Sequence, residues 1–377
     1  MKKNLYLFML AISVMACTPG VDEPAGPNPD DNPKYPDVTA DYQGFYVLNE
    51  GVMGANKATL DCFEYQTGEY QQDVFPVRNP SIIGQLGDVG TGLAIYGSKM
   101  YAIINGSNLV EVMDAKTAKH LASVEIPNVR CMTFDGDKVY FSSYAGQMQM
   151  GGTQLGYVVE MDTTTLQLGR SVTVGRQPEE MAIKDGKLYV ANSGGYTPEN
   201  YDNTLSVIDL QSFTEIKKLE VAINLHRVFL APDGGLYVSS RGNYGDVPAN
   251  LYVVDTQTEK VVKTLGKGVT SVALKDDVAY VINIEYGPAP EYKTIYDYYT
   301  INLSTHTINP GSFLSTDVQE KITYPYSVAV HPTVGDIIIT DASDFVTPGM
   351  LFYCNADGQL LWKHTTGDIP GSVAFLP

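Results

Sequence analysis

The sequence contains little cysteine, histidine or tryptophan, with 4 Cys, 5 His and 1 Trp among 377 residues. So few thiols and imidazoles leave little from which to build a zinc site or a disulfide framework. Basic residues are also scarce, because 25 Lys and Arg stand against 43 Asp and Glu, which gives a net charge of −18. A chain this acidic repels phosphate backbones, and this excludes a nucleic-acid partner.

Motifs of catalysis are missing as well. The sequence has no G-x-S-x-G elbow, no P-loop and no H-E-x-x-H motif. The histidines fall in different parts of the repeat described below, so a copper centre with several histidine ligands lacks its ligands. We therefore predict a protein that is not an enzyme and that requires no cofactor.

The residues that are abundant favour a turn-rich β protein. There are 35 Gly, 21 Pro and 26 Tyr, with 44% hydrophobic and 18% charged residues. This composition is typical of a folded chain, and its length is enough for two or three ordinary domains.

The N-terminus predicts export and lipid anchoring. Lys2 and Lys3 precede an apolar run at 5–14, which is too short for a good membrane-spanning helix. Val14-Met15-Ala16-Cys17 resembles a bacterial lipobox, which implies a signal peptide at 1–16 and lipidation of Cys17. We expect 17–38, rich in Pro and Asp, to be a flexible tether. The predicted location is the outer membrane of a Gram-negative bacterium, lipid-anchored and facing the cell exterior.

Four strand-like segments recur through the rest of the chain. Two of them, rich in β-branched and aromatic residues, can each be found seven times. The first of these two kinds lies at 45–51, 100–106, 139–146, 188–195, 236–243, 279–287 and 337–344. The second kind follows at 59–69, 109–119, 157–167, 204–214, 251–260, 298–307 and 351–359, and a short last strand follows it.

A short apolar strand precedes every copy of the first kind except that at 45–51. The missing copy is at the end of the chain, at 372–377. Seven four-stranded units predict an all-β fold, a seven-bladed β-propeller in which the C-terminal strand completes the first blade. This closure removes two open sheet edges. We predict that residues 39–377 form one domain.

The unit at 174–221 resembles the YVTN or YncE-like propeller repeat. It contains Gly175-Arg176-Gln177-Pro178, two strands, and a third strand with the sequence SVID at 206–209. The resemblance covers the whole folded region, and it implies the fold much more than the function.

Loop lengths are unequal, which indicates one functional face. Loops between the second and third strand of each unit are mostly long, and they share a face with the connections between units. Tyrosine offers a broad apolar surface with one hydroxyl, which suits a large amphipathic ligand or a protein partner. The candidate ligand-binding residues on this face are Asn49, Glu50, Asn105, Arg130, Tyr144, Gln147, Met148, Gln177, Asn192, Tyr196, Tyr201, His226, Arg227, Arg241, Tyr244, Tyr286, Tyr292, Tyr326, Asp341 and Phe345.

A metal at the ring centre is a separate question. Propeller lactonases hold a central calcium with Glu, Asn and Asp, and Glu50, Asn105, Asn192 and Asp341 end the equivalent strands here. The same residue types form ordinary turns stabilised by their own side chains, which is the interpretation that we prefer.

The anchor, tether, blade number and aromatic loops together resemble the BtuG family of surface lipoproteins. That resemblance implies capture of cobalamin or a related corrinoid and its transfer to a TonB-dependent outer-membrane transporter, with membrane contact only through the lipid. Two alternatives stay open: a surface-layer or adhesive propeller that binds protein, and a calcium-dependent propeller hydrolase.

Overall fold

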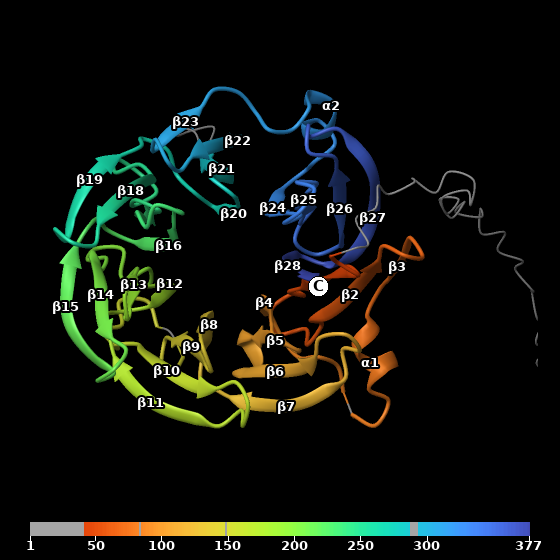
Figure 1. Cartoon of the computed structure of the whole chain (residues 1–377), viewed down its shortest axis with the longest axis horizontal. Helices are drawn as coiled ribbons and strands as arrows, with labels where there is room; N and C mark the ends of the chain where they lie inside the picture. Colours follow the sequence, from red (N-terminus) through yellow and green to blue (C-terminus); the bar gives the residue numbers. More distant parts are fainter. Residues whose placement is uncertain (1–40, 83, 148, 287–292) are drawn as a thin grey trace, which may run out of the picture. The chain divides into compact units, whose positions relative to one another are not determined.

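The computed structural model describes residues 41–82, 84–147, 149–286 and 293–377. The predicted signal peptide, Cys17 and the tether lie outside the described residues, as do Met148 and Tyr292. The described chain forms seven four-stranded antiparallel sheets arranged as the blades of a ring (Figure 1). This confirms the predicted seven-bladed β-propeller.

Each blade runs from an inner strand beside the central channel to an outer strand on the rim. Blades 1 to 4 consist, from inside to outside, of β28 (Pro370–Leu376), β1 (Gly44–Asn49), β2 (Thr59–Glu64) and β3 (Glu69–Gln71); β4 (Gly90–Tyr96), β5 (Lys99–Ile104), β6 (Leu109–Asp114) and β7 (His120–Glu125); β8 (Val129–Asp135), β9 (Lys138–Ser143), β10 (Tyr157–Asp162) and β11 (Leu168–Thr173); and β12 (Pro178–Lys184), β13 (Lys187–Asn192), β14 (Thr204–Asp209) and β15 (Thr214–Glu220).

Blades 5 to 7 consist of β16 (Leu225–Leu230), β17 (Leu236–Ser240), β18 (Asn250–Asp255) and β19 (Lys260–Thr264); β20 (Ser271–Lys275), β21 (Val278–Tyr286), β22 (Thr294–Asn302) and β23 (Thr307–Asn309); and β24 (Pro325–Val330), β25 (Ile337–Asp341), β26 (Pro348–Cys354) and β27 (Leu360–Asp368). Two short helices, α1 (Val74–Arg78) and α2 (Thr316–Gln319), lie in connections between blades, and a 3-10 turn covers Asn105–Ser107.

Burial explains why these residues form strands. The second strand of most blades is buried along almost its whole length, because neighbouring blades cover both of its faces. Such strands are continuous apolar runs, whereas rim strand β7 alternates between half-buried and exposed residues. Hydrophobic clusters join neighbouring blades; one contains Phe45 of blade 1 with Ile338 and Tyr353 of blade 7.

The ring closes as expected. Strand β28 pairs antiparallel with β1, from Gly44 opposite Leu376 to Leu48 opposite Ser372. The Gln43 backbone N–H also donates to the Leu376 carbonyl at 2.7 Å. The two ends of the propeller therefore protect each other's sheet edge.

Register fixes which loops share a face. The start of each inner strand pairs with the end of the second strand, as in Pro178 opposite Asn192 and Pro325 opposite Asp341. The connections between blades therefore meet the loops that follow the second strands. We call this side of the ring the long-loop face.

One predicted loop is shorter than expected. The sequence predicts strands at 279–287 and 298–307, but β22 already begins at Thr294 and pairs in register with β21 as far as Tyr286. Alternating aromatic and β-branched side chains, including the pair Ile284 and Tyr296, extend this ladder. Tyr286 therefore ends β21, within the strand predicted at 279–287, and the predicted loop shortens on the β22 side.

Candidate functional site at the long-loop face

Six of the seven inner strands contain one extra residue where they begin, on the long-loop face. Such bulges turn side chains away from the regular pleat. The residues of the bulges are Thr91, Arg130 and Cys131, Glu179 and Glu180, His226 and Arg227, Tyr326, and Gly371.

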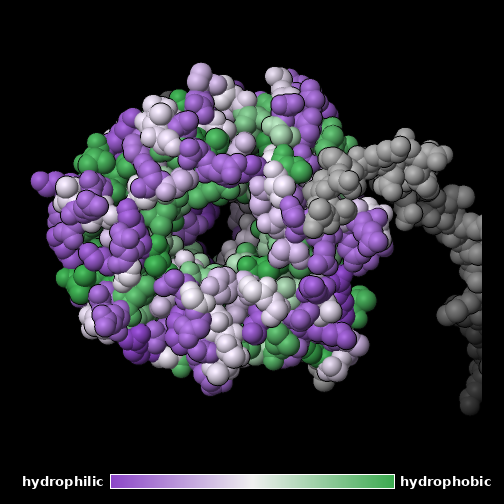
Figure 2. Space-filling model, in the orientation of Figure 1, coloured by the Kyte–Doolittle hydropathy of each residue, from purple (hydrophilic) through white to green (hydrophobic). Residues whose placement is uncertain are grey.

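Charged side chains from non-adjacent blades converge at the ring centre. Glu50 of blade 1 is influenced electrostatically by Arg130 of blade 3 and by Arg227 of blade 5. Only the central channel brings these blades together, and Figure 2 shows that the ring is open at its centre. We call Glu50, Arg130, Glu179, Glu180, Arg227 and Arg241 the channel cluster.

Glu179 is the most buried member of the cluster, with an exposed fraction of 3%. Its Oε1 accepts a hydrogen bond from the Tyr144 hydroxyl at 2.7 Å and one from Arg241 Nη1 at 3.0 Å. Burial opposes ionisation of this carboxyl, but Arg241 and Arg130 outweigh it and hold its pKa below the usual range. Three neighbouring blades are thus joined through one carboxylate.

A second ion pair joins blades 4 and 5. Arg227 Nη1 donates to Glu180 Oε1, and Arg227 Nε donates to the Thr270 carbonyl at 2.9 Å. The other oxygen of Glu180 accepts from the Val228 backbone N–H at 3.2 Å. These contacts fix the orientation of the Arg227 guanidinium.

Glu50 sits where the ring closes. The Tyr326 hydroxyl donates to Glu50 Oε1 at 2.9 Å. A β-carbon on Gly371 would lie 2.7 Å from the same oxygen, so only glycine leaves room for this carboxyl. Burial raises the Glu50 pKa to about 7, although Tyr326, Arg130 and Arg227 act in the opposite direction.

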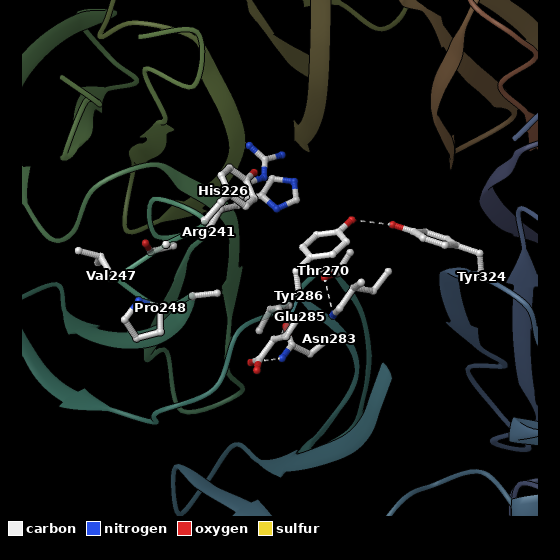
Figure 3. Close-up of a pocket in the computed structure, with 15 residues that line it drawn as sticks. His226, Arg241, Val247, Pro248, Thr270, Asn283, Glu285, Tyr286 and Tyr324 are labelled. Atoms are coloured by element: carbon white, nitrogen blue, oxygen red, sulfur yellow. Dashed lines mark hydrogen bonds between the residues drawn. The ribbon is translucent and has the colours of Figure 1, made fainter. Parts of the chain in front are cut away.

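A cavity of about 310 Å³ opens between blades 5 and 6. Figure 3 shows His226 beside Arg241 on one side and the hydroxyls of Tyr286 and Tyr324 turned toward each other, 3.3 Å apart, on the other. Its remaining lining residues are Ser240, Tyr244, Gly245, Val247, Pro248, Ala249, Val269, Thr270, Asn283, Ile284 and Glu285.

His226 is neutral in this environment. Burial lowers its pKa well below the usual value, and Arg241, Arg227 and Arg130 add to the effect. Its Nδ1 atom is buried and has no hydrogen-bond partner in the described part of the chain. The wall of the cavity therefore contains one buried polar atom without a partner.

A second cavity, of about 290 Å³, is lined mainly by amides. Gln147 and Gln177 both lie on it. It also contains Gln149, Gly152, Thr153 and Gln154. The long-loop face thus carries an aromatic hollow and an amide hollow.

Exposed apolar side chains gather on the same face. They include Tyr244 at 68% and Tyr286 at 56% exposed. Tyr196 is 40% exposed, and its ring is 6.3 Å from the buried ring of Tyr144. Loop tips add Met53, Met150, Leu155, Val247 and Val346, and Ile295 near the start of β22 is also exposed.

Four of the predicted residues serve the fold in this structure. Asn49 donates to Thr59 Oγ1 at 3.0 Å, and Asn105 donates to the Val129 carbonyl at 2.7 Å. The other two act in the same way: Asn192 accepts from Gly175 N–H and Asp341 from the N–H groups of Thr323, Tyr324 and Ser343. Their ligand contacts stay predictions.

Two further predicted residues lie near this face. Tyr201 is half-buried, and Phe345 packs edge-on against Tyr324 with ring centroids 4.6 Å apart. In the described ranges, no group of three or more His, Cys, Asp and Glu side chains is placed to hold a metal ion.

The channel cluster and the cavity between blades 5 and 6 together form what we call the mouth, and the sequence interpretation missed some of its residues. Glu180, Asn283 and Glu285 were not among the candidates, although Glu180 holds Arg227 and the other two line the larger cavity. A signal existed for Glu180: the bulges at the start of β12 and β16 hold the pairs EE at 179–180 and HR at 226–227, which stand out beside the apolar residues that follow them.

Fold and mouth together define the class: a seven-bladed β-propeller with one aromatic and charged face. The chain belongs to the family described as domain of unknown function (DUF5074), whose model matches residues 43–362. A comparison with curated proteins gave no match.

Solved structures share the fold at low identity. A quinonprotein alcohol dehydrogenase-like protein from Bacteroides thetaiotaomicron is 14% identical, with a TM-score of 0.61 over 89% of this chain and 78% of that one. Hydrazine synthase from Kuenenia stuttgartiensis is 17% identical, with a TM-score of 0.58 over 76% and 89%. Apo AztD from Citrobacter koseri is 11% identical, with a TM-score of 0.52 over 88% and 97%. These likenesses concern the fold alone.

The helices of the described residues are all too short or too polar to cross a bilayer.

Proposed function

We propose that this protein is a non-enzymatic cell-surface lipoprotein that captures cobalamin or a related corrinoid on its long-loop face. The observation that carries the proposal is that the long-loop face combines exposed tyrosines with buried polar atoms that lack partners. Arg130 Nε and His226 Nδ1 are both buried without a hydrogen bond in the described residues. Unsatisfied polar groups beside apolar surface favour a ligand that is amphipathic.

The size of the larger cavity decides how such a ligand would lie. A cavity of about 310 Å³ is at the lower end for ligand pockets and is smaller than a corrinoid. Only an edge or a side group would enter between blades 5 and 6. The macrocycle would rest on Tyr244 and Tyr286, with its amides near Asn283.

Transfer to a partner completes the proposal. The lipid on Cys17 would hold the propeller at the outer membrane, close to a TonB-dependent transporter. Met53 is 78% exposed and Val346 is 65% exposed, and both lie on loop tips of the long-loop face. Such tips suit contact with a transporter around a centrally bound ligand.

Calorimetric titration of the purified chain with cyanocobalamin, with and without EDTA, tests the proposal. We expect one-to-one binding that EDTA does not change. Tyr286→Ala should weaken it by about tenfold or more, because a central aromatic contact is lost. Tyr96→Ala is the matched control, since Tyr96 ends β4 at a short turn on the other face. Absence of heat at high micromolar ligand contradicts the corrinoid proposal.

One alternative also has an observation in its favour. The exposed methionines and aliphatic residues on the loop tips suit an adhesive propeller that binds another protein. It predicts no small-ligand binding by calorimetry. A protein partner would then be retained on the immobilised wild-type chain, and loss of that partner from a Met53→Asp, Val346→Asp variant would support this alternative.

A further inference from the structure

One arginine of the channel cluster differs from the other two. Arg227 is paired with Glu180, and Arg241 is paired with Glu179. Arg130 takes part in no hydrogen bond or ion pair of the described residues, and its Nε is buried. A half-buried guanidinium whose N–H groups lack acceptors lowers the stability of the fold unless a ligand accepts those hydrogen bonds.

The carboxyl groups near Arg130 leave its positive charge without a paired anion. Arg130, Arg227 and Arg241 face Glu179 and Glu180, and each of these two glutamates is already ion-paired with Arg241 or Arg227. Glu50 is the remaining carboxyl, and burial raises its pKa to about 7. Below neutral pH, Glu50 is protonated, so the channel cluster then carries one uncompensated positive charge.

Aromatic contact holds Arg130 in place. Its guanidinium carbon lies 4.8 Å from the centroid of the Tyr144 ring. The Tyr144 hydroxyl donates to Glu179 at 2.7 Å, which fixes the ring. An arginine that is already oriented loses little conformational entropy when it binds an oxygen acceptor.

We propose that the mouth of the central channel is a subsite for one anionic group, a phosphate or a carboxylate, bound by the Arg130 guanidinium. The planar fork of arginine matches either group through two parallel hydrogen bonds. The inference goes beyond the corrinoid proposal and holds for any ligand that carries such a group. Cyanocobalamin titration therefore does not decide it.

Inorganic phosphate is the first probe. Phosphorus NMR of phosphate added to the full chain at pH 6.5 should show saturable line broadening. Arg130→Met should weaken this binding by about tenfold or more, because the charged donor is lost. Arg130→Lys, which retains a positive charge, should recover part of the affinity.

Arg170→Met is the matched control. Arg170 is exposed on rim strand β11, pairs with Glu160 and lies outside the channel cluster, so this variant makes the same change in net charge. It should leave phosphate binding unchanged. Equal phosphate binding by wild type and Arg130→Met, or equal loss in Arg170→Met, overturns the proposal. Circular dichroism and melting temperature confirm that each variant is folded.

Acetate identifies the group that the subsite takes. If acetate displaces phosphate, the subsite accepts carboxylates; if it does not, the subsite selects phosphate. Saturation-transfer NMR of bound acetate also gives the pH dependence, because acetate keeps its charge between pH 6 and pH 8.5.

The groups facing Glu50 are Tyr326, Arg130 and Arg227, with Glu179, Glu180, Arg241 and neutral His226 completing the mouth. If acetate binds wild type, affinity should fall about fivefold as Glu50 ionises. Glu50→Gln should remove that fall. If acetate binds wild type and its affinity does not depend on pH, Glu50 is excluded from the subsite and the charge argument is wrong.

Discussion

Burial of the Glu50 carboxyl should make the stability of the protein depend on pH. Its carboxyl lies over Gly371 and accepts a hydrogen bond from Tyr326, and burial raises its pKa from 4.5 to about 7. In the folded protein the proton is therefore held up to neutral pH, whereas the unfolded chain loses it near pH 4.5. Stability falls as pH rises through this window, because the folded state binds more protons there.

The size of this effect follows from the shift. Each pKa unit corresponds to about 1.4 kcal/mol, so the free energy of unfolding loses at most about 3.5 kcal/mol between low and high pH through Glu50. Between pH 5 and pH 8 the loss is about 2.5 kcal/mol. Glu50→Gln cannot ionise, so it should be more favourable relative to wild type at pH 8 than at pH 5 by about 2.5 kcal/mol.

Urea denaturation of wild type and Glu50→Gln at both pH values measures this difference. Any constant effect of the amide cancels, because only the change between pH 5 and pH 8 counts. Glu220→Gln, at an exposed position on β15, is the control and should show little change. A difference between wild type and Glu50→Gln that is the same at both pH values would refute the account of Glu50.

Three other predictions concern the ion pair and ring closure. Arg241→Met leaves Glu179 buried without its hydrogen-bonded cation and should lower the free energy of unfolding by about 3–5 kcal/mol in urea denaturation at pH 8. The decrease should be smaller at pH 4, and an equal decrease at both pH values would contradict this prediction. Gly349→Ala places a β-carbon 2.4 Å from Pro370 Cδ and should lower the free energy of unfolding by about 1–3 kcal/mol. An unchanged melting temperature would contradict this expectation. Deletion of 370–377 exposes β1 and should abolish cooperative melting followed by circular dichroism; a wild-type transition contradicts it.

The fold could be predicted because each blade repeats a local pattern. Apolar strands, turn residues and an isolated final strand at 372–377 are visible in the sequence without any knowledge of contacts. The start of β22 was misjudged, because Gly and Pro at 287–290 suggested a longer loop while the side chains from Thr294 onward still paired with β21. Register between two strands is decided by pairing, which a single segment does not reveal.

The mouth could be predicted only in outline. Loop length indicated the face on which Tyr244 and Tyr286 line the larger cavity. The pairing of Glu179 with Arg241, and the place of Glu50 over Gly371, depend on how distant blades meet at the ring centre. Bulges at the start of six inner strands help to form these contacts, and a bulge depends on pairing between strands, which the sequence alone does not show.

Hydrogen–deuterium exchange with and without saturating cyanocobalamin tests the central claim, that the long-loop face is the ligand-binding face. The account predicts slower exchange at 241–249 and 283–286, which line the cavity between blades 5 and 6. The short turns at 136–137 and 185–186, on the other face, should exchange at unchanged rates. Protection confined to those turns, or no protection anywhere, would contradict the account.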